Sequence, residues 1–326
     1  MAIESWDVVI AGAGPAGLSA ALILGRACRR VLLADTGTPR SWASKAMYGF
    51  LTRDGIPPAQ FRQLAHRELR RYRNVKFLKA EVTAVKRERS GGFRVRVGKL
   101  PAVSCRKLLI ATGVFDHMPQ VEGIEQFFGS SVFQCPYCDG WEMRGQTIAV
   151  YGRGQRGFEM ARAMTAWSRD ITLCTDGASG LSPLARTHLA NNAIGLIEER
   201  VLRMEGEAGQ IANLVFRSGG RLACSALFFD TPYSDQSKLA QSLGCQFAKH
   251  GGVKCGRYEA TSVPGVFVAG NIIKDVQLSI VAAAEGTRAA FGINQALTRE
   301  DFEKRATGVR RIEHPMIDPD AQRRRR

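Results

Sequence analysis

The sequence predicts an α/β protein with two domains, each built around a parallel sheet covered by helices. Two observations lead to this fold class. A GxGxxG motif follows an apolar strand at residue 12 and again at residue 152, so one βαβ unit occurs twice. A further apolar strand at 265–269 lies near the C-terminal end. We expect two Rossmann-like three-layer domains, with 1–117 and 248–326 forming a split first domain and 118–247 an inserted, NAD(P)-type domain.

The composition is that of a folded protein, because 45% of the 326 residues are apolar and 23% are charged. The net charge of +16 would attract acidic partners, phosphates or membrane surfaces. Part of the excess lies at the C-terminal end, which closes on Arg323, Arg324, Arg325 and Arg326 and which we expect to be a tail. No signature of a nucleic-acid-binding module accompanies this charge, so no nucleic-acid partner is expected.

The N-terminal residues show no targeting pattern, and we expect a cytoplasmic protein. Residues 8–24 are largely apolar, but three glycines and a proline interrupt this run, and it is short for a bilayer span. A buried strand, a turn and a helix explain it better, so no membrane association is expected. Eight cysteines in such a chain indicate thiol, metal or redox chemistry before a structural disulfide framework.

The first glycine motif has every part of a dinucleotide-binding unit. An apolar strand at 7–11 precedes Gly12, a helix runs through residue 24, and a second strand at 30–34 ends at Asp35. Gly12 allows the tight turn, Gly14 lets the backbone approach a pyrophosphate, and Gly17 lets the helix pack on the strand. Asp35 would accept hydrogen bonds from ribose hydroxyls. The unit therefore predicts a bound adenine dinucleotide.

Two other strands of the first domain end in small or polar residues. The strand at 107–110 runs into Ala111, Thr112 and Gly113, and the strand at 265–269 runs into Gly270 and Asn271. Small side chains suit a backbone that passes close to a ligand, so we expect both strand ends to meet at one crevice. The other segments predict a loop and a basic helix over 38–73, an antiparallel appendage over 75–97 and a helix over 279–296.

The second motif predicts a strand at 147–151, a helix at 158–167 and a strand at 171–174. Immediately before it stand Cys135 and Cys138, a CxxC pair in which one thiol pKa is readily lowered. Half of a zinc site is the competing interpretation, but the chain has no second CxxC and no HxxxH, so no metal is expected. A purely structural disulfide is the other alternative. We favour redox activity. The remaining cysteines have no paired spacing and are interpreted as buried or incidental thiols.

With these motifs in place, the chain resembles the low-molecular-weight thioredoxin reductase family of flavoproteins. The resemblance covers nearly the whole chain: AGAGPAGLSAA at the start, ATG at 111–113, CPYCDG, the second GxGxxG and TSVPGVFVAGN at 261–271. It implies FAD in the first domain, a homodimer, and a redox disulfide against the isoalloxazine. By this resemblance Cys138 faces the flavin, Cys135 exchanges with substrate, and Asp139 is a general acid and base. Taken alone, an Asp after a CxxC is more often a turn or cap residue.

The same resemblance gives the set of cofactor-binding residues. They are Gly12, Gly14, Pro15, Ala16, Gly17, Asp35, Arg40, Val82, Ala111, Thr112, Gly113, Gly270, Asn271, Gln277 and Leu278. Gln277 and Leu278 would approach the flavin, although a helix cap and a core residue are their ordinary interpretations. Asn271 stands where many family members have Asp, and its amide still bonds ribityl hydroxyls.

The chain departs from the NADPH-using members at the second motif. Those members carry a basic cluster for the 2′-phosphate where this chain has residues 174–179 without a basic side chain, and Asp176 would repel such a phosphate. NADPH is therefore disfavoured. NADH stays open, because an acid at this strand end could hold the ribose diol. Arg153 and Arg156 stand where small residues usually admit the pyrophosphate, or they neutralise it.

The CPYCDGWE form without that cluster is most similar to the FAD-dependent dithiol oxidases of gliotoxin, holomycin and bacterial depsipeptide biosynthesis. This similarity implies oxidation of a small-molecule dithiol, with electrons passing to FAD and then to O₂ to give H₂O₂, independently of NADPH. Two alternatives stay open: a disulfide reductase that uses NADH or another donor on a thioredoxin-like protein, and a flavin-binding scaffold without turnover.

Four side chains near the CxxC have no settled role. Gln134 stands where many related sequences have His, so the base that activates the substrate thiol is unassigned. His117 is a candidate base, but a His near a domain junction is more often structural. Tyr137 and Trp141 either line a substrate groove or pack the loop.

Overall fold

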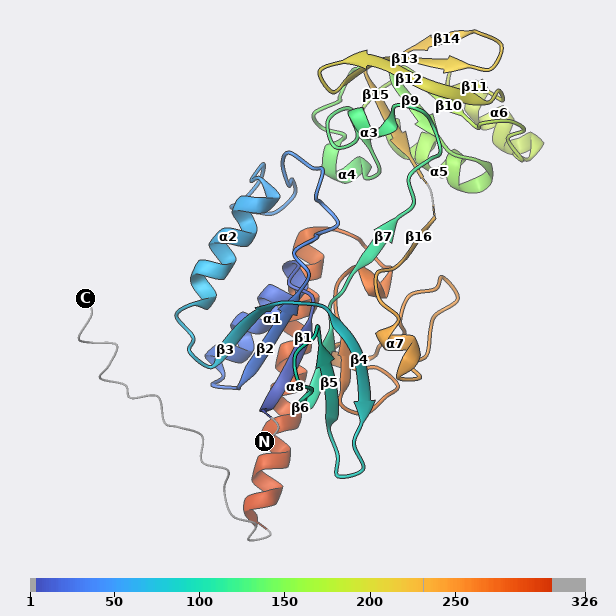
Figure 1. Cartoon of the computed structure of the whole chain (residues 1–326). Helices are drawn as coiled ribbons and strands as arrows, with labels where there is room; N and C mark the ends of the chain where they lie inside the picture. Colours follow the sequence, from blue (N-terminus) through green and yellow to red (C-terminus); the bar gives the residue numbers. More distant parts are fainter. Residues whose placement is uncertain (1–3, 231, 307–326) are drawn as a thin grey trace.

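The computed structural model describes residues 4–230 and 232–306 and has two domains joined by a pair of extended strands (Figure 1). The predicted basic tail at Arg323–Arg326 lies outside the described residues. The described residues of the first domain come from both halves of the chain, whereas every strand of the second domain's five-stranded sheet lies between residues 132 and 229.

A seven-stranded sheet forms the centre of the first domain, in the order β3-β2-β1-β6-β5-β4 with β17 also on β6. The pairs among β1, β2, β3, β6 and β17 are parallel, and β4–β5 and β5–β6 are antiparallel. The strands are β1 (Ser5–Ala11), β2 (Val31–Asp35), β3 (Val75–Lys79), β4 (Val82–Arg87), β5 (Phe93–Val97), β6 (Val103–Ile110) and β17 (Val266–Val268).

Helices α1 (Pro15–Arg26) and α8 (Ser279–Ala306) pack together against one face of this sheet, with α2 (Pro58–Leu69) beside α1 (Figure 1). The two helices approach closely, because a Cβ on Gly286 would lie 2.0 Å from the Ala16 carbonyl oxygen. A core of aliphatic side chains from β1, α1 and α8 holds this layer. The predicted cofactor-binding residues at the start of α1 are thereby fixed against α8.

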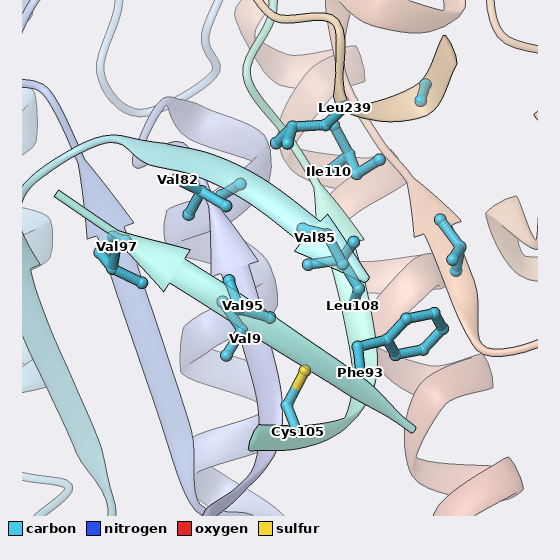
Figure 2. Close-up of a cluster of buried hydrophobic side chains, with 14 of the residues drawn as sticks. Val9, Val82, Val85, Phe93, Val95, Val97, Cys105, Leu108, Ile110 and Leu239 are labelled. Atoms are coloured by element: carbon cyan, nitrogen blue, oxygen red, sulfur yellow. The ribbon is translucent and has the colours of Figure 1, made fainter. Parts of the chain in front are cut away.

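On the other face of the parallel strands, side chains of β4 and β5, the antiparallel end of the same sheet, form one core with α7 (Leu239–Ser242). Figure 2 shows Val95 beside Val9 of β1, Val82 and Val85 on β4, and Leu239 close to Ile110. All of these side chains are buried. Burial of this apolar surface is the main force that joins the antiparallel strands to the parallel sheet.

The second domain has a five-stranded parallel sheet in the order β11-β10-β9-β15-β8 and a separate antiparallel sheet β12-β13-β14. One core lies between the parallel sheet and its helices, and another between that sheet and the antiparallel strands. The strands are β8 (Val132–Phe133), β9 (Ile148–Tyr151), β10 (Ile171–Cys174), β11 (Gly195–Ile197), β12 (Val201–Glu207), β13 (Gln210–Phe216), β14 (Arg221–Ala223) and β15 (Ala226–Phe229). The helices are α3 (Ile124–Phe127), α4 (Pro136–Asp139), α5 (Gly154–Met164) and α6 (Pro183–Asn191).

A two-stranded antiparallel ribbon connects the domains (Figure 1). It consists of β7 (Val114–Asp116) and β16 (Tyr233–Asp235), and Asp116 lies directly opposite Tyr233. The chain crosses once in each direction. Two short 3₁₀ turns, η1 (Arg257–Glu259) and η2 (Asn271–Ile273), complete the described elements.

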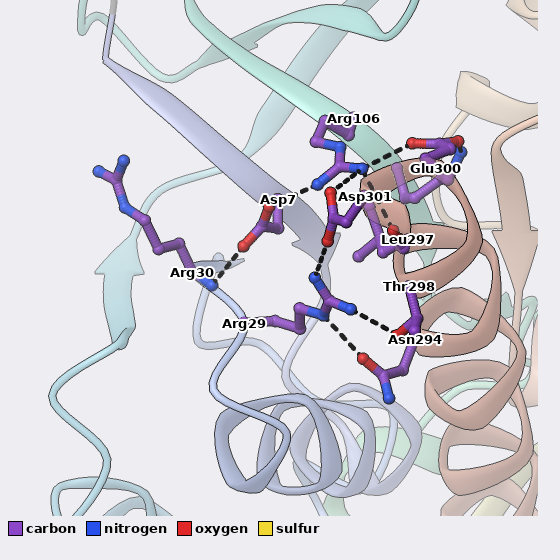
Figure 3. A network of polar contacts seen from close by, with 10 residues as sticks. Asp7, Arg29, Arg30, Arg106, Asn294, Leu297, Thr298, Glu300 and Asp301 are labelled. Atoms are coloured by element: carbon purple, nitrogen blue, oxygen red, sulfur yellow. Dashed lines mark hydrogen bonds and ion pairs between the residues drawn. The ribbon is translucent and has the colours of Figure 1, made fainter. Parts of the chain in front are cut away.

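A polar network ties the last turns of α8 to the sheet (Figure 3). Arg29 donates hydrogen bonds to Asn294 and Thr298 and pairs with Asp301 at 2.6 Å. Arg106 pairs with Asp301 at 2.7 Å, with Glu300 at 2.8 Å and with Asp7 at 3.2 Å. These contacts involve residues beyond 296, which explains why α8 continues to Ala306 and not to 296 as the sequence predicted.

The prediction of an antiparallel appendage over 75–97 is wrong for its first strand. β3 extends the parallel sheet, with Val75 opposite Val31, and only β4 and β5 are antiparallel. Alternation of apolar and polar residues does not distinguish a parallel edge strand from an antiparallel one. The chain reaches β3 through α2, which makes this a second βαβ crossover. In the second domain α5 begins at Gly154, earlier than the predicted residue 158, and ends at Met164.

Candidate active site

A cavity of about 840 Å³ lies at the carboxyl ends of the first domain's parallel strands and extends to α4 of the second domain. Ligands of open parallel sheets bind at this edge. Seventeen of the eighteen predicted site residues line it, and Gly17 does not. The lining members are Gly12, Gly14, Pro15, Ala16, Asp35, Arg40, Val82, Ala111, Thr112, Gly113, Cys135, Cys138, Asp139, Gly270, Asn271, Gln277 and Leu278.

The first glycine motif shapes the cavity wall as a dinucleotide requires. Gly12 has φ +103°, and a Cβ there would lie 2.3 Å from the Ala111 carbonyl oxygen. Gly17 stands behind the wall, where a Cβ would lie 1.9 Å from the Gly12 carbonyl oxygen. A Cβ on Gly14 would have nothing within 4 Å, so the backbone is open to the cavity at the N-terminus of α1. This cradle fits a pyrophosphate, which binds the free N–H groups of a helix N-terminus.

Asp35 stands at the end of β2 with both carboxylate oxygens engaged. It accepts hydrogen bonds from Ala13 N at 2.9 Å and Gly37 N at 2.9 Å and pairs with Arg62 at 2.6 Å. These contacts fix the carboxylate at the cavity edge, where a ribose hydroxyl would approach it. Arg62 itself lines the cavity and was not predicted.

The two predicted strand ends meet, as expected. β17 pairs with β6 so that Val268 lies opposite Ile110; Ala111 follows directly on β6, and Gly270 comes two residues after Val268. The Gly270 N–H donates to Glu285 Oε2 at 2.7 Å, and this bond from α8 holds the turn before Asn271. Burial raises the pKa of Glu285.

Cys135 and Cys138 form a disulfide in the cavity wall. Cys135 precedes α4, and its Sγ accepts a hydrogen bond from Cys138 N at 3.1 Å. Tyr137, one of the two residues between them, is 74% exposed, so the wall opens to solvent beside the pair. Such a pair is within reach of a ligand in the cavity and of a substrate from outside.

Asp139 has the electrostatics of a group that holds a proton near neutral pH. Burial raises its pKa to about 7, and the nearby Glu142 carboxyl adds to the shift. Burial, Glu142 and Asp139 together raise the pKa of Tyr48. The sequence did not point to Glu142 or Tyr48, since neither is part of a spaced motif.

Arg40 lies where the cavity meets the ribbon. Its guanidinium forms a two-pronged ion pair with Asp116, with Nε–Oδ2 2.6 Å and Nη2–Oδ1 2.5 Å, and it also donates to Gln277 Oε1. Gln134 Nε2 donates to the same Asp116 at 2.9 Å. Gln134, which the sequence left without a role, therefore joins this network. Asp116 was not predicted, although its place just after the 111–113 strand end is a signal.

The second glycine motif packs its third glycine on its first in the same way, but its backbone and its surroundings differ, since Gly154 has φ +61° where Gly14 has φ −73°. A Cβ on Gly157 would lie 2.5 Å from the Gly152 carbonyl oxygen, as in the first motif. Arg153 turns over the end of β10 and donates to the carbonyl oxygens of Thr175 and Asp176. The Asp176 carboxylate accepts from Val201 N at 2.9 Å. Arg156 pairs with Asp230.

The structure gives contacts for the other three side chains whose roles the sequence left open. His117 contacts Phe115 with ring centroids 5.6 Å apart and is not among the described residues that line the cavity. Trp141 is 64% exposed under the Arg144 guanidinium, whereas Tyr137 lines the cavity mouth and packs edge-on against Trp167.

Within residues 4–230 and 232–306, no group of three or more His, Cys, Asp or Glu side chains is placed to hold a metal ion. Over the same residues, no helix combines the length and the apolar character needed to cross a membrane.

Comparison with known proteins assigns the family. The model of the pyridine nucleotide-disulphide oxidoreductase family matches residues 6–286. Thioredoxin reductase sirT of Leptosphaeria maculans is 30% identical over 322 residues, which cover 92% of this chain and 97% of that protein. A probable thioredoxin reductase of Arthroderma benhamiae is 32% identical over 177 residues, which cover 53% of this chain and 44% of that protein.

Among solved structures, the crystal structure of HlmI is similar with a TM-score of 0.89 and 33% identity, over 93% of this chain and 96% of that one. Together with the dinucleotide cradle and the disulfide in its wall, these similarities identify the cofactor as FAD. The chain belongs to the pyridine nucleotide-disulphide oxidoreductase family and is an FAD-dependent thiol/disulfide oxidoreductase similar to thioredoxin reductases.

Proposed function

We propose that this oxidoreductase is a dithiol oxidase that closes a disulfide in a small-molecule dithiol without using NADPH. One observation carries the proposal. The Cys135–Cys138 disulfide lies in the wall of the FAD cavity, whereas the Arg153 side chain lies at the end of β10 beside the second glycine motif, bonded to the carbonyl oxygens of Thr175 and Asp176. Electrons therefore have a direct entry through the disulfide, and a nicotinamide nucleotide would first have to displace Arg153.

The residues divide the chemistry as follows. One substrate thiolate attacks the Sγ of Cys135, which breaks the Cys135–Cys138 bond and releases Cys138 as a thiolate. The second substrate thiolate then attacks the mixed disulfide, so the substrate leaves as a disulfide and the enzyme pair is reduced. Asp139, neutral below pH about 7, supplies a proton to a departing thiolate and takes one back. FAD held in the cavity by the glycine cradle and Asp35 would supply two-electron redox chemistry, which would carry the electrons of the reduced pair to O₂ and give H₂O₂.

The site residues are assigned on the same basis. Gly12, Gly14, Pro15 and Ala16 would receive the pyrophosphate and Asp35 a ribose, because they form one continuous wall at the N-terminus of α1. The ends of β6 and β17, with Gln277 and Leu278, would face the flavin. We propose in addition a cytoplasmic homodimer whose domains divide near residues 117 and 247.

A disulfide reductase that draws electrons from NADH or another donor is the second candidate. The names of the relatives from L. maculans and A. benhamiae favour it, since both are called thioredoxin reductases. The backbone of Gly154 is also unobstructed, since a Cβ there would have nothing within 4 Å.

The deciding experiment is an anaerobic titration of the FAD-loaded protein with dithiothreitol, NADH and NADPH in separate cuvettes, followed by air. An oxidase should lose its flavin absorbance with dithiothreitol alone and regain it in air while H₂O₂ forms. Bleaching by NADH or NADPH that outpaces bleaching by the dithiol would overturn the proposal and favour the reductase. A flavin that none of the three bleaches would fit only a binding protein.

A further inference from the structure

We propose that Arg40 is a positioning residue that holds the redox disulfide against the flavin cavity by fixing the ribbon between the two domains. The inference rests on the part of the proposed function in which electrons pass between the Cys135–Cys138 pair and the flavin.

The ribbon is short, with three residues in each strand, and it is the connection drawn between the two domains in Figure 1. A rotation about it would carry α4 and its disulfide away from the cavity. So few backbone hydrogen bonds leave the orientation of the domains to side-chain contacts.

Arg40 contacts both strands of the ribbon at one level. Its guanidinium forms the two-pronged ion pair with Asp116 on β7, and its Cζ lies 5.7 Å from the ring centroid of Tyr233 on β16. Asp116 and Tyr233 are direct cross-strand partners. A planar guanidinium is suited to grip a carboxylate with two bonds and an aromatic ring at once, which a lysine ammonium does not do.

A second cation contacts Tyr233 without the two-pronged ion pair. Lys274 Nζ lies 5.6 Å from its ring centroid and pairs with Asp235 on β16 at 3.0 Å. Both cations come from the first domain, Arg40 from the loop after β2 and Lys274 from the segment after η2. The first domain thus holds the ribbon from two directions.

The fixed ribbon connects directly to the disulfide. Gln134 Nε2 donates to Asp116 Oδ2 at 2.9 Å, and Gln134 is the residue before Cys135. The Asp116 side chain is only 12% exposed, so water competes little for these bonds. A chain of contacts therefore runs from Arg40 through Asp116 and Gln134 to the first redox cysteine.

A second contact between the domains lies beside this chain. Trp42, two residues after Arg40, contacts Phe128 with ring centroids 6.0 Å apart. A Cβ on Gly129 would lie 2.2 Å from the Ala43 carbonyl oxygen, so the same loop lies tightly on the second domain. The loop that carries Arg40 is thereby held on the second domain at Phe128 and at Gly129.

The test uses the FAD-loaded protein with Arg40→Lys, Asp116→Asn and, as a matched control, Arg94→Lys. Arg94 pairs with Glu88 on the exposed β4–β5 hairpin, far from the site in sequence and sheet position. In anaerobic rapid mixing with dithiothreitol, both site variants should bleach the flavin at least about tenfold more slowly than wild type, and the control should match wild type. Bleaching by dithionite, which bypasses the disulfide, should not change.

Hydrogen exchange of the amides at 114–116 and 233–235 gives a readout that does not depend on the reaction. Both site variants should exchange faster there, and the control should not. Asp116→Asn removes the ion pair but leaves the Arg40 charge in the cavity. If Arg40→Lys loses FAD, Asp116→Asn therefore still tests the inference. Bleaching within twofold of wild type in both site variants, or unchanged exchange, overturns the inference. If dithiothreitol does not bleach even the wild-type flavin, the proposed function fails, and the exchange data alone support or overturn the fixing of the ribbon.

Discussion

The two glycine motifs share the close packing of helix on strand and differ in the side chains that surround the start of the helix. In each, a Cβ on the third glycine would collide with the carbonyl oxygen of the first, at 1.9 Å in the first motif and 2.5 Å in the second. The first motif opens into the cavity beside Gly14 and the small residues of two neighbouring strand ends. The second is crossed by Arg153, and its strand-end acid, Asp176, is turned toward the backbone of Val201.

This difference indicates that the GxGxxG motif specifies the packing of the helix on the strand and does not by itself specify a nucleotide site. Glycines are needed for the packing of helix on strand whether or not a nucleotide binds. What admits the nucleotide is a helix N-terminus that opens into a cavity, as at Gly14, with an acid at the next strand end that lines the same cavity, as Asp35 does. By that criterion the first unit is the FAD site, and in our proposal the second serves as a scaffold for the CxxC.

The largest effect should come from removing a sulfur of the redox disulfide, because in the proposed function electrons enter through this disulfide and not through a nucleotide at the second glycine motif. We expect Cys135→Ser and Cys138→Ser each to lower dithiol turnover on the order of a thousandfold or more, because the exchange needs both sulfurs. FAD should stay bound, since the cradle of the first motif is untouched. Oxygen consumption and flavin absorbance measure both quantities. Cys28→Ser, an exposed free cysteine, is the control, and turnover that survives in either site variant would contradict the relay.

Asp139→Asn should lower turnover by about a hundredfold at pH 6, the usual range for a lost general acid. The wild-type carboxyl is neutral below its pKa of about 7 and charged above it, so the step that needs its proton should slow as pH rises through 7. The variant should lack that limb in a pH profile of turnover. A variant profile identical to wild type would assign the limb to another group.

The same substitution has a consequence for stability. The pKa of Asp139 is raised from its usual value of 3.8 to about 7 in the folded protein. Ionisation of the wild-type carboxyl therefore lowers the stability of the folded state, progressively as pH rises from about 4 to 7. Asn avoids that cost, so the variant should gain up to roughly 4 kcal/mol over wild type above pH 7, at about 1.36 kcal/mol per pKa unit. Urea unfolding at pH 4.5 and pH 8 would measure the gain.

A side chain at Gly14, where the first motif opens into the cavity, should make this motif resemble the second. Gly14→Val is compatible with the backbone, whose φ is −73°, and its side chain would project into the cavity. We expect FAD affinity to fall at least about tenfold, through lost approach of the pyrophosphate to the helix N-terminus. Gly256→Val is the matched control, because its Cβ also has nothing within 4 Å. Equal FAD content in both variants after dialysis would argue against the assigned site.

The smallest expected effect is the reverse change, which opens the mouth of the second motif. Arg153→Ala exposes the carbonyl oxygens at the end of β10 but leaves no group preorganised for a ribose or phosphate. We expect NADH to bind with a dissociation constant on the order of a millimolar, against no measurable binding in wild type. Titration calorimetry measures this, with the exposed Arg169→Ala as control. Tight NADH binding to the wild-type protein would remove the contrast between the two motifs.

The sequence predicted the repeated βαβ units, the meeting of two strand ends and the CxxC because each depends on local patterns. Gly12 and Gly270 identify positions where a backbone turns or approaches closely, and such positions follow from residue type. The length of α8 was underestimated because Glu300 and Asp301 look like an exposed polar end. Only the fold shows Arg29 and Arg106 beside them.

The residues that the sequence missed act through partners distant in the chain. Asp116 is an ordinary acid until Arg40 and Gln134 are brought to it from two other segments. Glu285 is one of many charged residues of a helix until its carboxylate meets the Gly270 N–H. No spacing rule links such positions, because tertiary packing alone sets their distance.

The network in Figure 3 has a consequence for the order in which the protein is completed during synthesis. Arg29 and Arg106 are made early, and their partners Asn294, Glu300 and Asp301 are made long after them. Until the ribosome has released residues beyond 301, the first domain lacks a complete α8, Arg29 lacks its partner Asp301, and Arg106 has only Asp7 as a counter-charge. The second domain's sheet, complete by residue 229, is ready to fold well before the domain that precedes it in the sequence. During synthesis the second domain is thus complete before the first.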